Sequence, residues 1–150
     1  MKTNQQKSFF LIVLHIFLAI GALGGGGALI LDPTGELSQL PLSLLYGSPF
    51  SNYLLPGIIL VLVLGVMPLL IALGLYRKSD WLLAEKLNIF HEKHWSWTFS
   101  LYIGFALIIW ITVQVFIIQT LSMLHFIYIL YGLVIQAVTL LPSVQEKYEK

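Results

Sequence analysis

Four long apolar segments that contain no Asp, Glu, Lys or Arg constrain this chain more than any other feature. They cover about residues 9–31, 54–76, 97–118 and 121–141. A bilayer core about 30 Å thick requires roughly 20 apolar residues in a helix. Backbone groups in lipid must be satisfied within the protein, and barrel strands would be shorter and would alternate in polarity. The sequence therefore predicts an all-α membrane protein with four transmembrane helices in a single domain, residues 1–150.

The remaining composition excludes several classes of function. Only 10% of the residues are charged, against about 25% in a soluble domain. The net charge of +1 gives no bias toward nucleic acid, so we expect none as a partner. The chain has no cysteine, which excludes disulfide scaffolds, thiolate metal sites and cysteine nucleophiles.

The basic residues predict the orientation of the four helices. All eight lie before the first segment, between the second and third, or after the fourth: Lys2, Lys7, Arg77, Lys78, Lys86, Lys93, Lys147 and Lys150. The positive-inside rule makes this side cytoplasmic. Both termini are then inside, and the first segment, too long for a signal peptide, stays uncleaved. Residues 32–53 form an external segment, residues 77–96 a cytoplasmic loop, and helices three and four an antiparallel hairpin.

Two connections carry more apolar residues than solvated loops do. The leucine-rich external segment, 32–53, is expected to lie on the outer interface, to fold back over the bundle, or to re-enter it. In the cytoplasmic loop, Ser79 or Asp80 could cap a short helix. The apolar side of that helix would rest on the inner leaflet and would comprise Trp81, Leu83, Leu87 and Phe90.

A run of glycines occupies the outer end of the first helix: Gly21, Gly24, Gly25, Gly26 and Gly27. Glycine weakens a helix but permits close backbone approach, and Gly21 with Gly25 fits the small-xxx-small packing pattern. One interpretation is tight packing, within the chain or between subunits, so that Gly25→Leu would disturb folding or assembly. The other is a thinned, bendable helix end beside a ligand or pore.

The candidate ligand-binding residues lie mainly around the external segment. Asp32 and Glu36 could bind a cation or a polar head group, or Asp32 could simply cap a turn. Ser51 or Asn52 could cap the second helix, and Pro68 should kink it. The full candidate set is Asp32, Thr34, Glu36, Asn52, Tyr53 and His15.

Histidines and glutamines are further candidate site residues. His15 and His125 fall near opposite ends of their helices, so one haem could not take both. The pair His91 and His94 is one residue short of the HExxH zinc motif. We therefore predict no metal site and no cofactor, and expect His15 to be hydrogen-bonded within the bundle, although a buried histidine is a site candidate. Gln114 and Gln136 could bond across helices or line a polar cavity.

Four stretches, residues 24–35, 41–45, 47–50 and 53–57, cover about a third of the chain from the first helix to the start of the second. In these stretches the chain resembles a family of small uncharacterised bacterial membrane proteins that has no assigned activity. The resemblance implies a bacterial inner membrane and the four-span arrangement, and it implies no activity.

Three functional hypotheses follow. The first is a non-enzymatic packing or accessory subunit that oligomerises, or binds a membrane-protein partner, through the helix 1 glycines. The second is a binder or carrier of a small apolar or lipid-like molecule held under the external segment. The third is an outer-leaflet membrane enzyme that uses Asp32 or Glu36 as its acid–base group. A binder should show an apolar pocket beneath residues 40–50 with a few converging polar groups.

Overall fold

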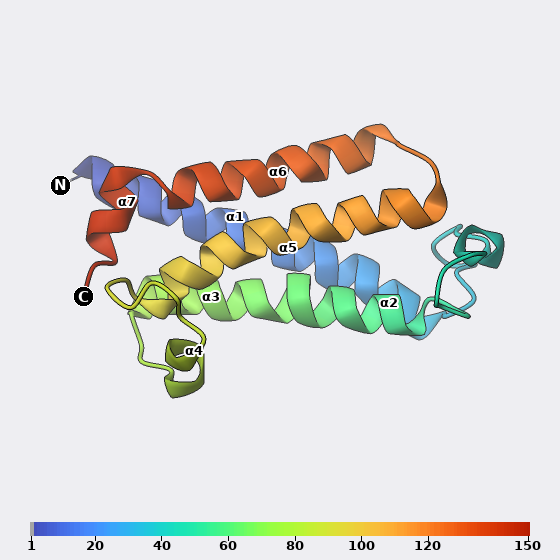
Figure 1. Cartoon of the computed structure of the whole chain (residues 1–150), viewed down its shortest axis with the longest axis horizontal. Helices are drawn as coiled ribbons and strands as arrows, with labels where there is room; N and C mark the ends of the chain where they lie inside the picture. Colours follow the sequence, from blue (N-terminus) through green and yellow to red (C-terminus); the bar gives the residue numbers. More distant parts are fainter. Residues whose placement is uncertain (1) are drawn as a thin grey trace.

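The structure, a computed structural model, describes the backbone of residues 2–150 and the side chains of residues 6–150. Met1 and the side chain of Lys2, which entered the charge argument above, lie outside this described part. In Figure 1 helical rods run between the two ends of an elongated bundle. Across residues 2–150 no strand is present beyond a single antiparallel bridge between Lys93 and Glu149. The prediction of an all-α protein is confirmed for the described chain.

The four rods follow the four apolar segments. The first is α1 (Lys2–Leu31); the second combines α2 (Leu54–Ile59), the π-helix η2 (Leu60–Val66) and α3 (Met67–Arg77); the third and fourth are α5 (Trp95–Ile118) and α6 (Met123–Thr139). Short elements complete the fold: η1 (Leu42–Leu45), α4 (Leu82–Lys86) and α7 (Pro142–Lys147). Three rods are long and apolar enough to cross a membrane, over Gln6–Leu31, Leu54–Arg77 and Trp95–Ile118.

The fourth rod, α6, is shorter than its apolar segment. Its 17 residues begin after Ser122, whose backbone N–H and hydroxyl both bond to the ring of His125. These bonds satisfy groups that a helix start leaves open, so the helix begins there and not at residue 121. Pro142 opens α7 and cannot continue the preceding ladder of backbone hydrogen bonds.

The two ends of the bundle have different connections (Figure 1). Both termini, α4 and α7 lie at one end, whereas residues 32–53 and the link 119–122 lie at the other. We call these the terminal end and the loop end. Because the link is short, α6 folds back along α5 as an antiparallel neighbour, and these two helices are in extensive contact.

Glycines bring the rods together in two pairs. In the first pair, α1 packs on the second rod, where a Cβ on Gly26 would lie 2.9 Å from the Gly57 carbonyl oxygen. In the second pair, a Cβ on Gly104 of α5 would lie 3.0 Å from the Gly132 carbonyl oxygen of α6. Such backbone contact requires residues without side chains, as in small-residue packing between membrane helices.

The two pairs are joined most closely at the terminal end. There α3 contacts α5 and α7 contacts α1, while α1 and α6 share fewer contacts. The core at this end contains the buried rings of Trp95, Trp97 and Tyr148. Toward the loop end the pairs are less tightly joined, and this leaves room for the cavity described below.

The second rod contains a π-helix next to the position where the sequence predicted a kink at Pro68. Residues 60–66 are π-helical and end two residues before Pro68, which lacks the N–H that a regular helix would use. In Figure 1 α2, η2 and α3 follow one another as a nearly continuous rod. In a regular helix Gly65 would be rotated about 80° from Gly57. The wider π turn reduces that rotation, so both residues contact α1, at Leu23 and Leu29 respectively.

The helix expected in the cytoplasmic loop is shorter than predicted, and its cap was assigned wrongly. Helix α4 has five residues with Trp81 at its N-cap, where no side chain binds the helix amides, so neither Ser79 nor Asp80 caps it. It stops before the buried Asn88, whose amide accepts from the Phe90 N–H (3.1 Å) and donates to the Lys93 carbonyl (2.8 Å). These local bonds compete with a continued helix.

The apolar residues of this loop do not share one face. Trp81 and Phe90 pack against the core cluster, whereas Leu83 and Leu87 are 65% and 61% exposed. Leu83 and Leu87 are therefore available to contact a leaflet, as are the neighbouring Leu82 and Ile89, which are 82% and 67% exposed.

The external segment folds back over the loop end of the bundle, one of the arrangements expected for it. Leu45 and Phe50 pack in a cluster with Leu29 of α1 and Ile117 of α5. The Tyr53 backbone N–H donates to the Pro33 carbonyl at 3.0 Å, which closes the segment into a loop. Leu40 and Leu45 thus help to cover the helix ends, whereas Leu37 and Leu42 remain 65% and 40% exposed.

Candidate functional site

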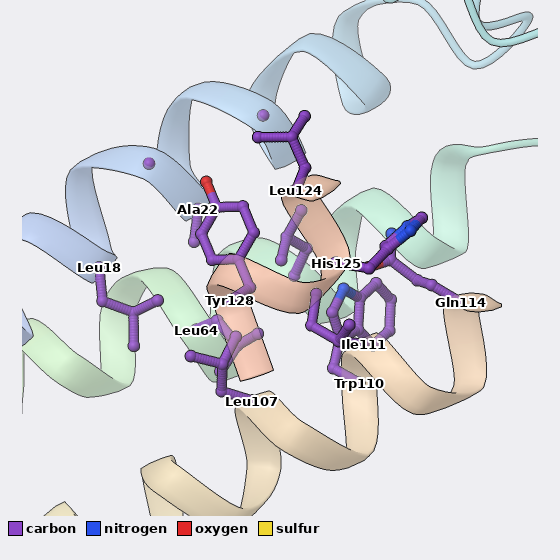
Figure 2. Close-up of a pocket in the computed structure, with 13 residues that line it drawn as sticks. Leu18, Ala22, Leu64, Leu107, Trp110, Ile111, Gln114, Leu124, His125 and Tyr128 are labelled. Atoms are coloured by element: carbon purple, nitrogen blue, oxygen red, sulfur yellow. The ribbon is translucent and has the colours of Figure 1, made fainter. Parts of the chain in front are cut away.

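A cavity of about 230 Å³ lies between the two helix pairs, on the loop-end side of their junction (Figure 2). All four rods contribute to its wall, which is largely aliphatic and aromatic. The lining residues are Leu18, Gly21, Ala22, Gly25, Leu60, Leu64, Leu107, Trp110, Ile111, Gln114, Leu124, His125 and Tyr128. An apolar interhelical space with a few polar groups is the usual form of a small-molecule site.

The predicted glycine face divides into three parts. Gly21 and Gly25 line the cavity, and a Cβ on either would lie 3.9 Å from its nearest neighbour, the Tyr128 hydroxyl or a Leu60 methyl. Gly26 makes the tight contact with the second rod. A Cβ on Gly24 or Gly27 would meet no atom within 4 Å. Within the described chain, close packing therefore falls on Gly26 and not on Gly25, the position chosen from the sequence pattern.

Four hydrogen-bonding side chains interrupt the apolar wall, and two come from each of α5 and α6: Trp110, Gln114, His125 and Tyr128. In the described chain the Trp110, Gln114 and Tyr128 side chains make no hydrogen bond. His125 Nδ1 accepts from the Ser122 backbone N–H at 3.1 Å, so the neutral ring carries its proton on Nε2. The cavity is thus lined by three N–H or O–H donors, together with an amide that both donates and accepts.

A groove between α1 and α6 continues the cavity toward the side of the bundle. It shares Leu18, Gly21, Leu124 and Tyr128 with the cavity wall. Its outer edges are exposed side chains, Phe17 at 69% and Ile127 at 49%. In a bilayer such a groove would open to lipid chains.

A second, smaller space lies where the sequence predicted a pocket beneath the external segment. It has a volume of about 90 Å³ and is lined in part by Leu40, Leu45 and Phe50. Trp110 and Gln114 belong to both this space and the larger cavity. The pocket predicted for a binder is therefore present, but the larger volume lies deeper, beside Gly21 and Gly25.

Asp32 serves as an intramolecular turn cap. Its carboxylate accepts hydrogen bonds from the Thr34 N–H (3.1 Å), the Thr34 hydroxyl (2.5 Å) and the Leu37 N–H (2.7 Å). The bonds from the Leu37 amide and the Thr34 hydroxyl lower the pKa of Asp32 below its ordinary value of 3.8. This geometry is the turn cap that the sequence offered as one of two interpretations.

We expect the Leu37 amide proton shift to follow Asp32 in an acid titration with a midpoint below 3.8, the ordinary pKa of the group. Because the folded pKa is lowered, the bonds to the carboxylate contribute fully above 3.8 and are lost as the pH falls through the lower folded value. Solution NMR of the labelled protein in micelles measures this shift. Asp32→Asn should abolish the titration and Glu36→Gln should preserve it. A midpoint at or above 3.8 would contradict the cap.

The other external candidates do not converge on one site. Asn52 accepts a hydrogen bond from the Leu54 N–H (3.0 Å), but the N-cap of α2 is Tyr53 and no side chain caps the helix, so the cap predicted at Ser51 or Asn52 is wrong. Tyr53 is 5% exposed, its hydroxyl donates to the Pro41 carbonyl (3.0 Å), and its ring lines the smaller space. Thr34 and Glu36 line a shallow surface depression.

His15 belongs to a buried polar chain rather than to the cavity. Its Nε2 lies 2.7 Å from the Ser100 hydroxyl, which lies 2.8 Å from the Thr139 hydroxyl. Thr139 in turn donates to the Ile135 carbonyl at 2.7 Å. The expectation that His15 is hydrogen-bonded within the bundle is confirmed. Gln136 packs against Gly104 in the α5–α6 contact.

The remaining histidines are placed by local structure. His94 caps α5, its Nδ1 accepting from the Ser96 N–H at 3.3 Å, and burial lowers its pKa. His91 is exposed. Among the described residues no group of three or more His, Cys, Asp or Glu side chains is placed to hold a metal ion.

Sequence reasoning identified part of the cavity wall. Gly21 and Gly25 were singled out, and a polar cavity was one of two readings of Gln114. Trp110 and Tyr128 were missed, because aromatic residues recur throughout the spans and the pattern does not show which of them face inward. No family model, no curated protein and no solved structure matches this chain.

Proposed function

We propose that the chain is a four-span protein of a bacterial inner membrane with both termini in the cytoplasm. The 17 residues of α6 fall at the short end of the range for a spanning helix, roughly 17–25 residues. Six of the basic residues end or follow α3, precede α5 or follow α6, and these positions lie at the terminal end of the bundle. The positive-inside rule then assigns this end to the cytoplasm. The bacterial membrane rests on the sequence resemblance alone.

Single cysteines test this orientation cleanly, because the chain contains none. Glu36 and Ser79 are both exposed and lie at opposite ends. In intact cells, a membrane-impermeant maleimide should label Glu36→Cys and should reach Ser79→Cys only after permeabilisation. Equal labelling of both variants in intact cells, or the reverse pattern, would contradict the proposed topology.

We further propose that the protein binds a neutral, lipid-soluble molecule in the interhelical cavity. The observation that carries this proposal is the set of donors on an otherwise apolar wall: the Trp110 indole, the His125 Nε2–H and the Tyr128 hydroxyl. A donor without a partner in an apolar setting is costly, and a ligand acceptor would offset that cost. The fitting head group carries carbonyl, ester or ether oxygens.

The lining residues also limit the charge and shape of the ligand. The cavity wall contains no Asp, Glu, Lys or Arg, so a charged head group would be desolvated without a counter-charge. The groove between α1 and α6 offers a path by which a hydrocarbon tail would reach the bilayer. A quinone-like or glycerolipid-like molecule has this combination of a neutral acceptor head and an apolar tail.

A second candidate function, the accessory subunit, has its own supporting observation. Gly24 and Gly27 leave a bare backbone strip on α1, where an added Cβ would meet no atom of the described chain within 4 Å. A helix of a second copy or of a partner protein could approach it closely. The enzyme reading loses support, because Asp32 already receives three intramolecular hydrogen bonds.

Native mass spectrometry of the protein released from lipid nanodiscs tests both candidates. The wild type should retain one neutral lipid-like mass per chain. Gly25→Leu places a side chain in the cavity and should reduce retention roughly tenfold or more, since each displaced methylene contact is worth about 0.8 kcal/mol. Gly24→Leu is the matched control, one residue away and outside the cavity lining.

Each outcome separates the two functions. Loss of the bound mass in Gly25→Leu with retention in Gly24→Leu supports the binder. A wild-type chain without any bound mass, with an oligomeric number that changes in Gly24→Leu alone, supports the accessory subunit and rejects the binder. Equal retention in all three proteins would show that the bound mass is not held in this cavity.

A further inference from the structure

A separate cavity of about 300 Å³ lies at the terminal end of the bundle, far from the proposed ligand site along the helices. It is formed where α1, the end of α3 and α7 come together. Three basic side chains and four apolar or aromatic ones line it: Arg77, Lys78, Lys147, Phe9, Ile12, Leu75 and Tyr76.

The basic side chains of this cavity have no acidic partner within the described chain. The two ion pairs present there, Lys93–Glu149 at 3.5 Å and Lys150–Glu85 at 2.6 Å, involve other lysines. Burial, together with repulsion from the Lys78 ammonium, lowers the pKa of Lys147. Three cations around one recess without a carboxylate favour an anion as occupant.

Contacts within the chain position two of these cations, Lys78 and Lys147. Lys78 ends α3 in the left-handed conformation, with φ of 51°, and its N–H donates to the Gly74 carbonyl at 2.8 Å. Its ammonium donates to the Lys147 carbonyl. The ammonium groups of Lys78 and Lys147 lie 5.3 and 5.8 Å from the centroid of the Tyr148 ring. Both amines thus lie against the same buried aromatic ring before any ligand arrives.

The apolar part of the wall lies at the ends of two apolar rods. Phe9 belongs to the apolar helix Gln6–Leu31 and is 65% exposed. Tyr76 belongs to Leu54–Arg77 and is 76% exposed. The recess therefore joins a cationic rim to an apolar side wall, which suits a molecule that has an anionic head and a hydrocarbon chain.

We propose that this cavity binds the phosphate group of an anionic phospholipid from the leaflet at the terminal end of the bundle. Arg77 and Lys147 contact the phosphate oxygens, with Lys78 beside them, and an acyl chain runs along Phe9 and Tyr76. Basic pockets between membrane helices bind acidic head groups in this way. The guanidinium of Arg77 suits phosphate oxygens, because it presents paired donors. This proposal does not depend on the ligand of the interhelical cavity.

The test compares lipid retention by native mass spectrometry after release from phosphatidylcholine nanodiscs that contain a minor fraction of phosphatidylglycerol. The wild type should retain phosphatidylglycerol in preference to phosphatidylcholine. Arg77→Gln and Lys147→Gln should each weaken this preference roughly fivefold, and the double variant roughly thirtyfold, at about 1 kcal/mol per basic residue. Lys86→Gln removes the same charge from an exposed residue at the same end and should leave the preference unchanged.

A second arm adds inorganic phosphate to the protein in nanodiscs of phosphatidylcholine alone. Retention of phosphatidylglycerol that requires Arg77 and Lys147, without stable binding of inorganic phosphate, supports the lipid site. Binding of inorganic phosphate alone would overturn the phospholipid as occupant. An equal effect of Lys86→Gln would overturn the site itself, because it would show a general response to surface charge. Unchanged melting temperatures of the glutamine variants in phosphatidylcholine would confirm that they are folded.

Discussion

Gly26→Ala should lower the free energy of unfolding by about 1–3 kcal/mol, the usual cost of overpacking a filled contact. The added Cβ would lie 2.7 Å from a Val61 methyl, 2.9 Å from the Gly57 carbonyl oxygen and 3.1 Å from the Val61 nitrogen. A methyl group can turn aside, but a carbonyl oxygen and an amide nitrogen within a helix cannot. The helix pair must therefore separate, which weakens every contact between α1 and the second rod.

Gly27→Ala is the matched control for this effect. It adds the same methyl one residue further along the same helix, where no atom lies within 4 Å of the new Cβ. Alanine favours the helix by up to about 1 kcal/mol over glycine, so this variant should be more stable than the wild type. Reversible unfolding in mixed micelles measures both. Changes of the same sign in the two variants would contradict the Gly26–Gly57 contact.

A double variant makes the assignment more specific. Gly26 and Gly57 face each other across one contact, so Gly26→Ala combined with Gly57→Ala should not show additive losses. Once the first methyl has separated the helices, the second should cost less than it does alone. Strict additivity would place the two glycines in independent environments.

Tyr148→Ala should destabilise the protein by about 3–5 kcal/mol, the range for removing a large buried aromatic side chain. The ring is fully buried, with 0% exposure. Its hydroxyl donates to the Leu75 carbonyl of α3 at 2.8 Å and accepts from the Ser8 hydroxyl of α1 at 2.6 Å. Its carbonyl accepts from the His94 N–H at 2.8 Å. The side chain thus joins α1 to α3, and the backbone bond to the start of α5 remains in the alanine variant.

Two further variants separate the ring from its hydroxyl. Tyr148→Phe keeps the packed ring but leaves the Ser8 hydroxyl without its partner, at a cost of about 1–3 kcal/mol. Ser8→Ala removes that partner and should cost less than Tyr148→Phe, because the bond to Leu75 remains. Equal stability of Tyr148→Ala and wild type in the micelle unfolding experiment would show that the C-terminal segment does not secure the bundle.

Much of the fold could be predicted from the sequence, because hydropathy acts over whole segments. The four apolar segments form the four helical rods, and the helices on either side of the short link 119–122 are antiparallel neighbours. Errors arose where a single residue decides the outcome. The helix expected at Ser79 or Asp80 begins later and stops early, because the amide of Asn88 bonds within the loop.

The glycine contact shows why helix packing is harder to predict than helix position. The sequence pattern marked Gly21 and Gly25, which are one turn apart, but the contact falls on Gly26. Its position depends on the partner rod, where a π-helix over residues 60–66 keeps Gly57 and Gly65 toward α1. The π-helix lies in the second rod and is not apparent from the sequence of the first helix. The first helix alone therefore does not show which of its glycines contacts the second rod.

Only part of the candidate site could be predicted, because the site also depends on how the helices pack. An apolar space beneath residues 40–50 follows from a leucine-rich segment that must cover helix ends, and it is present. The larger cavity depends on how far two helix pairs diverge, which no local pattern records. In the sequence, Trp110 and Tyr128 cannot be told apart from other aromatic residues of membrane helices. Both line the cavity because the helix pairs diverge there.

The groove between α1 and α6 has a consequence for any affinity measured at the cavity. Because the groove leads sideways from the cavity, acyl chains of the surrounding bilayer have access to the same volume. A ligand would then exchange with membrane lipid rather than enter a vacant site, and its apparent dissociation constant would be a ratio of two affinities. Membranes with chains that fit the cavity poorly would make the same ligand bind more tightly. Host lipid composition is therefore a thermodynamic variable of the binding reaction itself.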